Sequence, residues 1–370
     1  MSGEAAPGWP SGFASGQDDR DALLVLSALR GLKPRQLLSL ANREGTARSC
    51  LDAIRQGRAG SVADQAFARD LRADDIRAAL EATQARMVAF GDEEYPPGLL
   101  HLADPPAQLF VRGGRLEPGD GRPRVAVVGA RGCTALGREV ARGIGRGLVG
   151  AGAVVVSGAA RGIDSASHEG ALAASGATWA VLGSGIDVGY PRSSASLIGR
   201  IASVGSVISE YPPGVPAEPF RFPARNRIIA AVSEAVVLVE GAEHSGSLIT
   251  AEHALELGRE VFAVPGAVNN PLARAPLQAI HDGAAMIRGA DDLLAALGLA
   301  DDRAAAVRSQ MSLVEVAVCD LLAGPTLPEA VARELNCEMS QLMPVLLSLE
   351  LKGLVRNEGG RFELTAAATT

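Results

Sequence analysis

Glycine, arginine and hydroxyl residues gather in four short segments of the chain. In one-letter code these are GARGCT at 129–134, SGAARGID at 157–164, FPARNR at 222–227 and EGAEHSGS at 240–247. Glycine lets a ligand approach the backbone closely, free N–H groups at the start of a helix bind phosphate oxygens, and arginine adds a bidentate charge. Four such segments suit a polyanion better than one small phosphate, provided that the fold brings them to one edge.

The same residues also have structural interpretations. Asp164, Ser245 and Ser247 belong to the residue types that cap helices, and a glycine-rich turn often serves only as a tight connection. Phe222 is explained as well by a place in the core beside Pro223 as by a stacking role. The functional interpretation therefore depends on the four segments acting together.

Cofactor and metal chemistry find little support in the sequence. Only two lysines occur, Lys33 and Lys352, and neither belongs to a P-loop motif. The segment GRGLVG at 145–150 matches the dinucleotide-binding pattern, but it lies late in a predicted helix, whereas that motif must follow a strand and open a helix. The histidines show no metal-ligand spacing; they are His101, His168, His244, His253 and His281. We therefore predict neither a cofactor nor a metal.

Two glutamates are candidate catalytic acids. Glu240 ends an apolar run, and Glu252 follows the Ser-Gly-Ser segment on a predicted helix. A solvated or arginine-paired carboxylate is the alternative explanation for both.

Six short apolar runs rich in β-branched residues predict the elements that position these segments. They begin at residues 125, 154, 179, 207, 236 and 261, and each ends at Gly, Ser, Glu or Pro. Short, wholly apolar runs separated by helical patterns are typical of buried parallel strands. Leu136, Val140, Ile144 and Leu148 form a helical stripe between the first two runs. The sequence predicts an α/β fold with a Rossmann-like, doubly wound, mostly parallel sheet, whose ligands bind outside the carboxyl ends of the strands.

Composition shifts divide the chain further. We expect a disordered tail at 1–18, a small helical domain at 19–90, a Pro/Gly-rich connector at 91–121, the Rossmann-like core at 122–298 and a linker at 299–310. Residues 311–370 show three helical patterns and then a hairpin pattern, which is the order of a winged-helix domain. The third of these helices, from Ser340 to Glu350, has no arginine or lysine, so we expect it to bind protein or to pack internally.

The net charge of −7, from 35 basic and 42 acidic residues, argues against binding nucleic acid by bulk charge. Its distribution is uneven. Residues 122–290 carry fifteen arginines and no lysine against thirteen acidic residues, whereas residues 291–370 carry six basic and twelve acidic residues. The only net-positive region is therefore the one with the glycine-rich segments.

The cysteines and the hydropathy pattern predict a cytoplasmic protein. Cys50, Cys133, Cys319 and Cys337 stand far apart, as free thiols of a reducing compartment do. No run of about 18 apolar residues occurs in the sequence.

Several longer motifs resemble, in order and spacing, the DNA-processing protein A (DprA) family. They are SGAARGID at 157–164, FPARNRIIA at 222–230, SGSLITA at 245–251 and GREVFAVPG at 258–266. The runs YPPGL at 95–99 and DPPAQLFVRG at 104–113 also look like that family's approach to its core. The resemblance is strong from about residue 95 to 290, and the flanking regions resemble sterile-alpha-motif-like and winged-helix domains in outline.

This resemblance implies a protein without enzymatic activity that acts in natural transformation and recombination. Such proteins bind single-stranded DNA with little sequence specificity, protect it and load the RecA recombinase onto it, often as homodimers formed through the core. The DNA-binding residues that we expect are Arg131, Thr134, Ser157, Gly158, Arg161, Gly162, Phe222, Arg225, Asn226, Arg227, Ser245, Gly246 and Ser247.

The chain departs from the family's pattern at three places. Ala130 replaces a serine, Leu136 replaces a tyrosine, and APL at 275–277 replaces Gly-Thr-Asn. These changes put one hydroxyl contact and one phosphate-facing turn in question.

A nucleotide hydrolase is the alternative from another class, because SGSLITAE at 245–252 faintly resembles a hydrolase loop that ends in glutamate.

Overall fold

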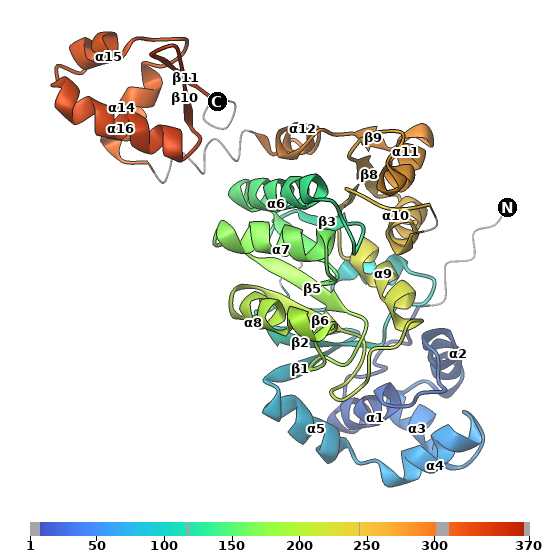
Figure 1. Ribbon diagram of the computed structural model, residues 1–370. Helices are drawn as coiled ribbons and strands as arrows, with labels where there is room; N and C mark the ends of the chain where they lie inside the picture. The colour runs from blue at the N-terminus through green and yellow to red at the C-terminus, as the bar shows by residue number, and fades with distance from the viewer. Residues whose placement is uncertain (1–7, 117–118, 244, 301–310, 366–370) are drawn as a thin grey trace. The chain divides into compact units, whose positions relative to one another are not determined.

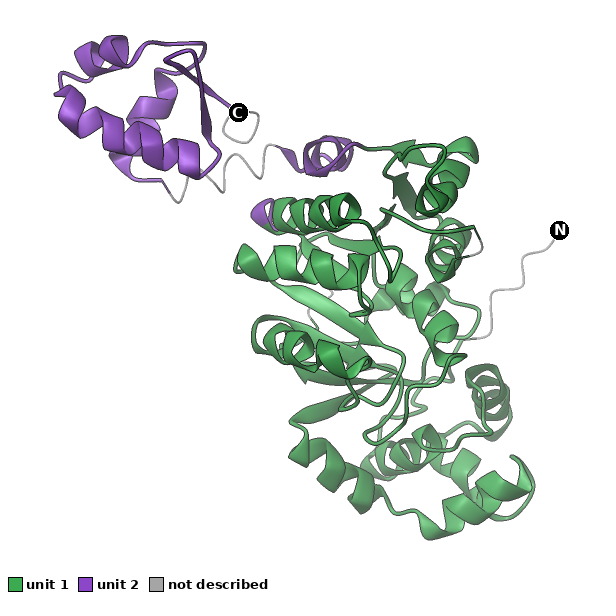
Figure 2. Ribbon diagram, viewed as in Figure 1, with its two compact units in different colours: residues 1–149, 153–287 green, residues 150–152, 288–370 purple. Residues whose placement is uncertain are grey.

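The computed structural model describes residues 8–116, 119–243, 245–300 and 311–365 (Figure 1). The chain divides into two compact units, of residues 1–149 with 153–287 and of residues 150–152 with 288–370 (Figure 2). We call them unit 1 and unit 2. Unit 1 contains all four glycine-rich segments.

One nine-stranded sheet organises unit 1. Its strands are β1 (Ala85–Ala89), β2 (Gln108–Gly113), β3 (Arg124–Val128), β4 (Val154–Ser157), β5 (Thr178–Leu182), β6 (Ser206–Ser209), β7 (Ala235–Leu238), β8 (Glu260–Ala263) and β9 (Ala285–Met286). They lie in the order β1-β2-β6-β5-β4-β3-β7-β8-β9. From β6 to β9 all pairs are parallel, whereas β2 pairs antiparallel with both β1 and β6.

The predicted fold class and its six core strands are confirmed. Every residue of β3, β4, β5, β6 and β7 is buried, which explains why these strands have no polar alternation. From β3 the chain continues through β4, β5 and β6 on one side of the sheet, and β7 and β8 then lie on the other side of β3. The topological switch point is therefore between β3 and β7, at their carboxyl ends.

Helices cover the sheet between successive strands. They are α6 (Ala135–Gly150), α7 (Ile163–Ala173), α8 (Ala195–Val204), α9 (Arg221–Ala231), α10 (Gly246–Glu256) and α11 (Arg274–His281), with short 3-10 helices η1 (Pro97–His101), η2 (Arg192–Ser194) and η3 (Pro271–Ala273). The segment GRGLVG at 145–150 closes α6 and does not open it, which confirms that it is no dinucleotide-binding turn.

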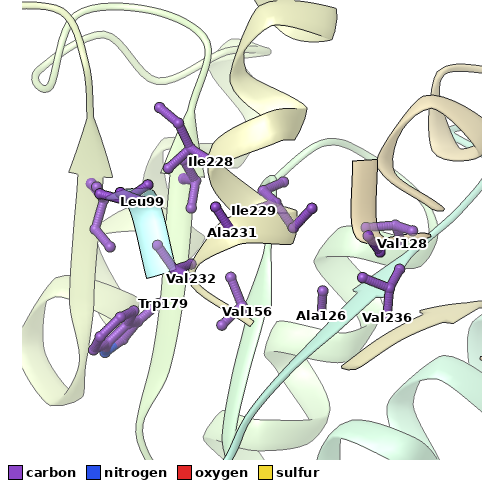
Figure 3. Close-up of a cluster of buried hydrophobic side chains, with 14 of the residues drawn as sticks. Leu99, Ala126, Val128, Val156, Trp179, Ile228, Ile229, Ala231, Val232 and Val236 are labelled. Carbon is purple, nitrogen blue, oxygen red and sulfur yellow. The ribbon is translucent and has the colours of Figure 1, made fainter. Parts of the chain in front are cut away.

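The main core lies between the sheet and α9 (Figure 3). Ile228 and Ile229 of α9 face Val156 and Val128 at the centre of the sheet, and Trp179 closes the cluster at one side. Ile228, Ile229 and Val156 are at most 1% exposed. This packing fixes the start of α9 above the carboxyl ends of the strands.

Five helices form a layer at the N-terminal end of unit 1. They are α1 (Gln17–Ser27), α2 (Pro34–Glu44), α3 (Ala47–Arg55), α4 (Val62–Asp70) and α5 (Ala73–Ala82). Trp9 and Phe13 stack at 4.8 Å and are buried in the core of this layer. The sequence predicts a disordered tail over 1–18, of which residues 1–7 lie outside the described residues. The packing of Trp9 and Phe13 differs from that prediction, because two large aromatic rings provide enough apolar surface to order the segment.

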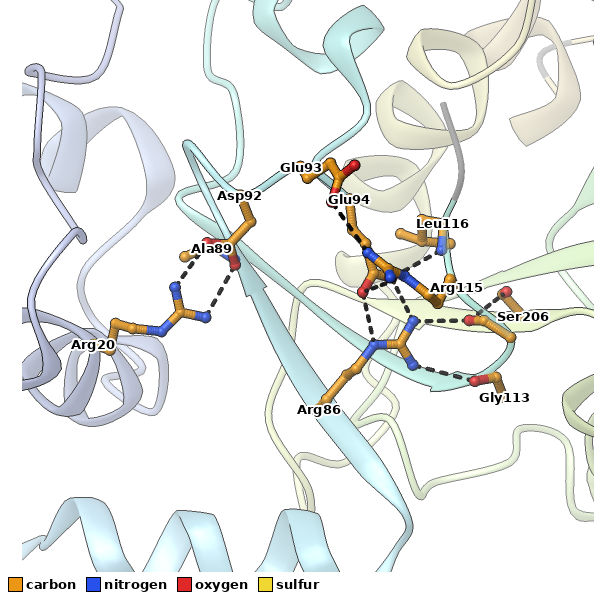
Figure 4. A network of polar contacts seen from close by, with 11 residues as sticks. Arg20, Arg86, Ala89, Asp92, Glu93, Glu94, Gly113, Arg115, Leu116 and Ser206 are labelled. Carbon is orange, nitrogen blue, oxygen red and sulfur yellow. Dashed lines mark hydrogen bonds and ion pairs between the residues drawn. The ribbon is translucent and has the colours of Figure 1, made fainter. Parts of the chain in front are cut away.

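The helical layer shares a core and an ion pair with the sheet (Figure 4). Ala89 of β1 and Ala107 belong to the same buried cluster as α1 to α3. Arg20 of α1 donates to both carboxylate oxygens of Asp92, at 2.7 and 3.0 Å, and Asp92 also accepts from the backbone of Ala89. Although burial acts in the other direction, these contacts hold the pKa of Asp92 below its ordinary value.

Strands β1 and β2 occupy residues that the sequence assigns to the helical domain and to the connector. Arg86 of β1 holds Glu94 at 2.6 Å and also donates to the carbonyl of Gly114, next to β2 (Figure 4). The run Leu109-Phe110-Val111, fully buried, is the sequence signal of β2. An antiparallel hairpin thus extends the parallel sheet where we expect only a connection.

Unit 2 contains a smaller arrangement of helices and strands. It consists of α12 (Ala290–Ala296), α14 (Leu313–Asp320), α15 (Pro328–Glu334), α16 (Met339–Leu351), β10 (Val355–Glu358) and β11 (Arg361–Leu364). The two strands form an antiparallel hairpin around a core that includes Leu346, Leu349 and Phe362. This order is the one on which the winged-helix prediction depends; most of the predicted linker, 301–310, lies outside the described residues.

Candidate nucleic-acid interface

A cleft of about 390 Å³ opens at the switch point of the sheet. All four glycine-rich segments contribute to its lining: residues 129–131 after β3, residues 160 and 164 after β4, residues 222, 223, 225 and 226 at the start of α9, and residues 245–247 at the start of α10. We call it the switch-point cleft. Parallel strands place the segments that follow them at one edge, and this is why segments more than 100 residues apart in the sequence meet here.

An arginine on an aromatic ring forms one wall of the cleft. The guanidinium of Arg131 lies over the ring of Phe222 at 4.8 Å, and Phe222 packs against Tyr190 at 5.3 Å. Arg131 is exposed. A charged group on an aromatic face offers both a phosphate contact and a stacking surface. Phe222 is therefore part of the cleft, and the alternative of a core position does not apply.

Arg161 stands on the loop next to Arg131. The backbone N–H of Ile163 donates to the carbonyl of Ala130 at 3.2 Å, so the loops after β3 and β4 touch. Gly162 makes this contact possible, because it has a φ of +85° and a Cβ there would lie 2.2 Å from the oxygen of Ala130. Arg161 is exposed and has no partner among the described residues. The two arginines are thus free cations on contacting loops.

The start of α10 presents unpaired backbone amides to the cleft. Ser245 is the N-cap residue, but its side chain accepts no bond from the helix backbone. Instead its Oγ lies 2.7 Å from the Oγ of Ser247, and Asn226 donates to the carbonyl of Gly246 at 2.8 Å. The first N–H groups of a helix have no intrahelical partner, so Gly246 and Ser247 offer donors to an anion. His244 lies outside the described residues.

Arg225 lines the cleft but serves the protein interior. Its guanidinium donates to the carbonyl of Gly158 at 2.9 Å and to that of Val181. Burial lowers the pKa of Arg225 to about 10, while the charge of Asp164 acts in the opposite direction. Gly158 is required beneath it, since a Cβ there would lie 2.3 Å from the guanidinium. Both residues fix the loop after β4, and their expected contact with phosphate stays a prediction.

Asp164 is a buried carboxyl in the same cleft. Burial raises its pKa, although the charge of Arg225 opposes the shift. Asp164 lies inside α7, whose N-cap is Gly162, so it is not the cap of that helix.

Arg227 faces away from the cleft. Its guanidinium lies 2.8 Å from Glu210 and 3.3 Å from Asp104. Burial alone would lower the pKa of Arg227, but these two carboxylates outweigh it and the net shift is upward. Residues two apart on a helix point about 200° from each other, so Arg225 and Arg227 cannot serve one surface. The expected DNA contact of Arg227 stays a prediction, and its pairing with Glu210 and Asp104 does not favour it.

Two expected hydroxyl contacts are also committed elsewhere. Ser157 is fully buried, and its Oγ donates to the carbonyl of Val127 at 2.6 Å. Thr134 donates to Glu240 through its hydroxyl at 2.6 Å and its backbone N–H at 2.8 Å. Glu240 thus places a carboxylate at the start of α6, where a phosphate would otherwise bind. This contact explains the strand-end glutamate without a catalytic role.

The sequence did not predict some of the residues that line the cleft. Tyr190 and Pro219 line it, and neither belongs to one of the four segments. Their only signal is their place after β5 and before α9, at the carboxyl edge of the sheet. Glu252, the candidate hydrolytic acid, is exposed on α10 and does not line the cleft.

The three departures from the family's pattern occupy different environments. Ala130 lines the cleft, whereas the side chain of Leu136 is 75% exposed. Ala275 is fully buried, and its N–H donates to the carbonyl of Gly241 at 3.0 Å. Residues 275–277 lie in the first part of α11 and not in a turn, and Ala275 packs against Gly241 of the loop that leads to α10.

Within the part of the chain that the structure describes, no group of three or more His, Cys, Asp or Glu side chains is arranged to hold a metal ion. Nor is any helix among those residues long and apolar enough to cross a membrane.

Comparisons with known proteins agree with this architecture. Residues 86–298 match the family of DNA recombination-mediator protein A. The DNA processing protein DprA of Bacillus subtilis is 40% identical over 218 residues, which are 59% of this chain and 73% of that protein. The crystal structure of DNA processing protein A from Streptococcus pneumoniae aligns with a TM-score of 0.65 and 32% identity, over 76% of this chain and 98% of that one.

A second solved structure concerns the single-stranded DNA binding mode of DNA processing protein A from Helicobacter pylori. It aligns with a TM-score of 0.52 and 28% identity, over 58% of this chain and 95% of that one. The family match spans the sheet from β1 to β9 and every loop of the switch-point cleft. The chain belongs to the DNA recombination-mediator protein A family.

Proposed function

We propose that the chain binds single-stranded DNA in the switch-point cleft. The single observation that carries this proposal is the stacked pair of Arg131 and Phe222 opposite the open start of α10. Arg131, Arg161 and the amides of Gly246 and Ser247 contact phosphates, and Phe222 stacks on a base. The relative from Helicobacter pylori, whose structure concerns single-stranded DNA binding, supports the same ligand.

The proposed contacts determine how the affinity for DNA depends on base sequence and on salt concentration. Phosphates and ring faces are common to all four nucleotides, so affinity depends weakly on sequence. Each charged phosphate contact on a single strand contributes about 0.7 to the slope of log K against log salt concentration. Binding therefore weakens as salt rises.

The test is an anisotropy titration of a labelled oligonucleotide with Arg131→Gln, Phe222→Ala and the double variant. We expect each single change to weaken binding about 10-fold, since stacking alone contributes about 1–3 kcal/mol per base. Arg131→Gln should also lower the salt slope by about 0.7. Arg146→Gln on α6, an exposed arginine outside the cleft, serves as control. Wild-type affinity in the double variant would refute the proposal.

We further propose that bound DNA is passed to the RecA recombinase and that the protein works as a homodimer through its core, in the cytoplasm, during natural transformation. Family membership and the motif resemblance support this role. The expected result is faster RecA filament growth on single-stranded DNA when the chain is present, with the Arg131→Gln/Phe222→Ala variant inactive. Sedimentation of the free protein tests the dimer.

The proposal includes no catalytic turnover. Glu252 is exposed outside the cleft, and this position supports binding over hydrolysis. Chromatography after incubation with nucleoside monophosphates and with the oligonucleotide should recover both unchanged. Turnover that Glu252→Ala abolishes would favour the hydrolase instead.

A further inference from the structure

The helical layer carries a basic surface that the proposed cleft does not use. Between Asp21 and Glu44 the chain has four basic residues and no acidic one. They are Arg30, Lys33, Arg35 and Arg43, all exposed, and none has a side-chain ion pair among the described residues. In a chain with a net charge of −7, such a segregated run of cations is favourable for an anionic ligand.

These cations border two hollows on either side of α2. The first, of about 130 Å³, lies between α2 and the core and is lined by Arg30, Lys33 and Arg221. The second, of about 650 Å³, lies between α2 and the turn before α4 and is lined by Arg35, Arg43 and Arg58. No acidic residue is among the described residues that line the second hollow. We call these two hollows together with α2 the α2 surface.

The first hollow adjoins the switch-point cleft through a shared loop. Pro219 and Phe222 line the cleft, whereas Phe220 and Arg221, between them, line the hollow. The side chain of Phe220 is 65% exposed. Arg221 is buried, pairs with Glu218 at 2.9 Å and lies over the rings of Tyr211 and Phe220, so the exposed cations of this hollow are Arg30 and Lys33. Figure 1 shows α2 at the end of the helical layer closest to α9. Aromatic and cationic groups therefore continue from the cleft onto the helical layer.

The first hollow also contains polar side chains that lack hydrogen bonds. Trp9 Nε1 is a buried donor and Gln108 Oε1 a buried acceptor, and neither has a partner among the described residues. Both residues line this hollow and are 6% and 5% exposed. Glu210, the acidic residue among the described residues that line it, is paired with Arg227 at 2.8 Å. An unpaired donor and acceptor beside cations match a ligand that carries both phosphates and base edges.

We propose that the α2 surface is a second binding segment for single-stranded DNA, which takes the strand after it leaves the cleft over Phe220. This inference rests on the proposed function. Arg30 and Lys33 hold phosphates at the shared hollow, and Arg35 and Arg43 hold the next ones along α2. Eight residues separate Arg35 from Arg43, which is about 12 Å along a helix axis. The strand is thereby guided away from the sheet along a single line of cations.

The α2 surface is fixed relative to the cleft by contacts already described. Trp9 and Phe13 belong to one buried cluster with Leu37 and Leu38 of α2 and with Ala107 beside β2. Arg20 and Asp92 join α1 to the segment after β1. A strand bound in the cleft therefore meets α2 in a constant position.

The experiment compares a short oligothymidylate of about 6 nucleotides with a long one of about 20. Its variant is Arg35→Gln/Arg43→Gln, and its matched control is Arg146→Gln/Arg200→Gln, which removes the same charge from exposed positions on α6 and α8. We expect the α2 variant to bind the short oligonucleotide normally and the long one about 5- to 20-fold more weakly. Its salt slope for the long strand should fall by about 1.4, which is two single-strand contacts. Arg35→Lys/Arg43→Lys should restore most of the affinity.

The outcomes separate this inference from the proposed function. If the short oligonucleotide fails to bind the wild type, or binds Arg131→Gln/Phe222→Ala equally well, the cleft proposal itself fails. If the short strand depends on the cleft but both charge-matched variants bind the long strand alike, only the α2 surface is refuted. If Arg35→Gln/Arg43→Gln leaves DNA binding unchanged but abolishes binding of polyglutamate, the surface belongs to an acidic protein partner and the inference is also overturned.

Discussion

Arg131 and Arg225 line the same cleft but have different roles. Arg131 is exposed over the face of Phe222, whereas Arg225 lies beneath the loop after β4 and bonds two backbone carbonyls. Charge on a buried guanidinium is already used by its partners, so little of it remains for a ligand. Residue type alone does not distinguish the two roles, and burial does.

Substituting these two arginines should therefore give opposite results. Arg225→Met leaves the carbonyls of Gly158 and Val181 unpaired and removes the positive charge beside Asp164, so the free energy of unfolding should fall by about 2–4 kcal/mol. Arg131→Gln should change it by less than about 0.5 kcal/mol and weaken DNA binding instead. Urea denaturation measures the first quantity. Equal stability of the two variants would show that Arg225 is not a structural residue.

His168 is a second buried group whose role is structural. Its Nδ1 lies 2.7 Å from the hydroxyl of Thr178, which donates to the carbonyl of Val155, so Nδ1 carries the hydrogen and Nε2 is an acceptor without a partner among the described residues. Burial, with the charge of Arg225, lowers the pKa of His168 to about 3. The folded state thus holds a neutral imidazole at every physiological pH.

This shift makes stability depend on pH. An unfolded histidine takes up a proton below pH about 6.5 while the folded one does not, so the stabilising contribution is complete above that pH and is lost as pH falls toward 3. The slope approaches about 1.4 kcal/mol per pH unit, which is about 2 kcal/mol between pH 6.5 and 5. Urea titrations at several pH values should show this loss in the wild type and not in His168→Asn. Parallel curves for the two proteins would argue against it.

At the scale of elements, two glycines of α6 have different roles. Gly137 in its first turn allows the carboxylate of Glu240 to reach Thr134, since a Cβ at residue 137 would lie 2.4 Å from that carboxyl carbon. At Gly143 an added Cβ would have no described neighbour within 4 Å. The first glycine is required by a neighbour, and the second only lowers helix propensity.

Alanine at these two positions should shift stability in opposite directions. Gly143→Ala should raise the free energy of unfolding by about 0.5–1 kcal/mol, because alanine is the better helix former. Gly137→Ala should lower it by about 1–3 kcal/mol, because the added carbon displaces Glu240 from the start of α6. Thermal melts of the two variants provide the comparison. A stabilised Gly137→Ala would mean that Glu240 moves aside freely.

At the scale of the whole molecule, charge is separated between the units. The core carries the exposed Arg131 and Arg161, while residues 291–370 contain twice as many acidic as basic residues. Helix α16 of unit 2 has no arginine or lysine, and its exposed face includes Leu347 and Leu351. An apolar helix without cations is poorly suited to a DNA groove and better suited to protein contact.

Removal of residues 301–370, which contain most of unit 2, should consequently leave DNA binding intact. A chain that ends at residue 300 retains the sheet, the cleft and the α2 surface. We expect its affinity for a long oligonucleotide to stay within about 2-fold of the full chain at equal salt. Anisotropy titration of both chains is the measurement. A loss of 10-fold or more would place DNA contacts in unit 2.

The sequence by itself determined the strands and the edge where a ligand binds. Apolar runs such as Val125–Val128 and Val154–Val156 specify buried parallel strands because both faces of such a sheet are covered, and the segments after them must then meet at one edge. It did not determine that β1 and β2 join the sheet, because the apolar run Leu109–Val111 is only a short signal and its pairing with Met87 and Val88 depends on contacts across the sheet.

Only the tertiary structure decided which arginines and hydroxyls remain available to a ligand. Arg131 and Arg161 are exposed. By contrast, the side chains of four other expected contacts are committed to partners elsewhere in the chain; they are Arg225, Arg227, Ser157 and Thr134. Availability depends on burial and on partners distant in sequence, and no local motif encodes either. For the same reason the sequence did not predict the α2 surface, which depends on the position of α2 beside the loop at Phe220.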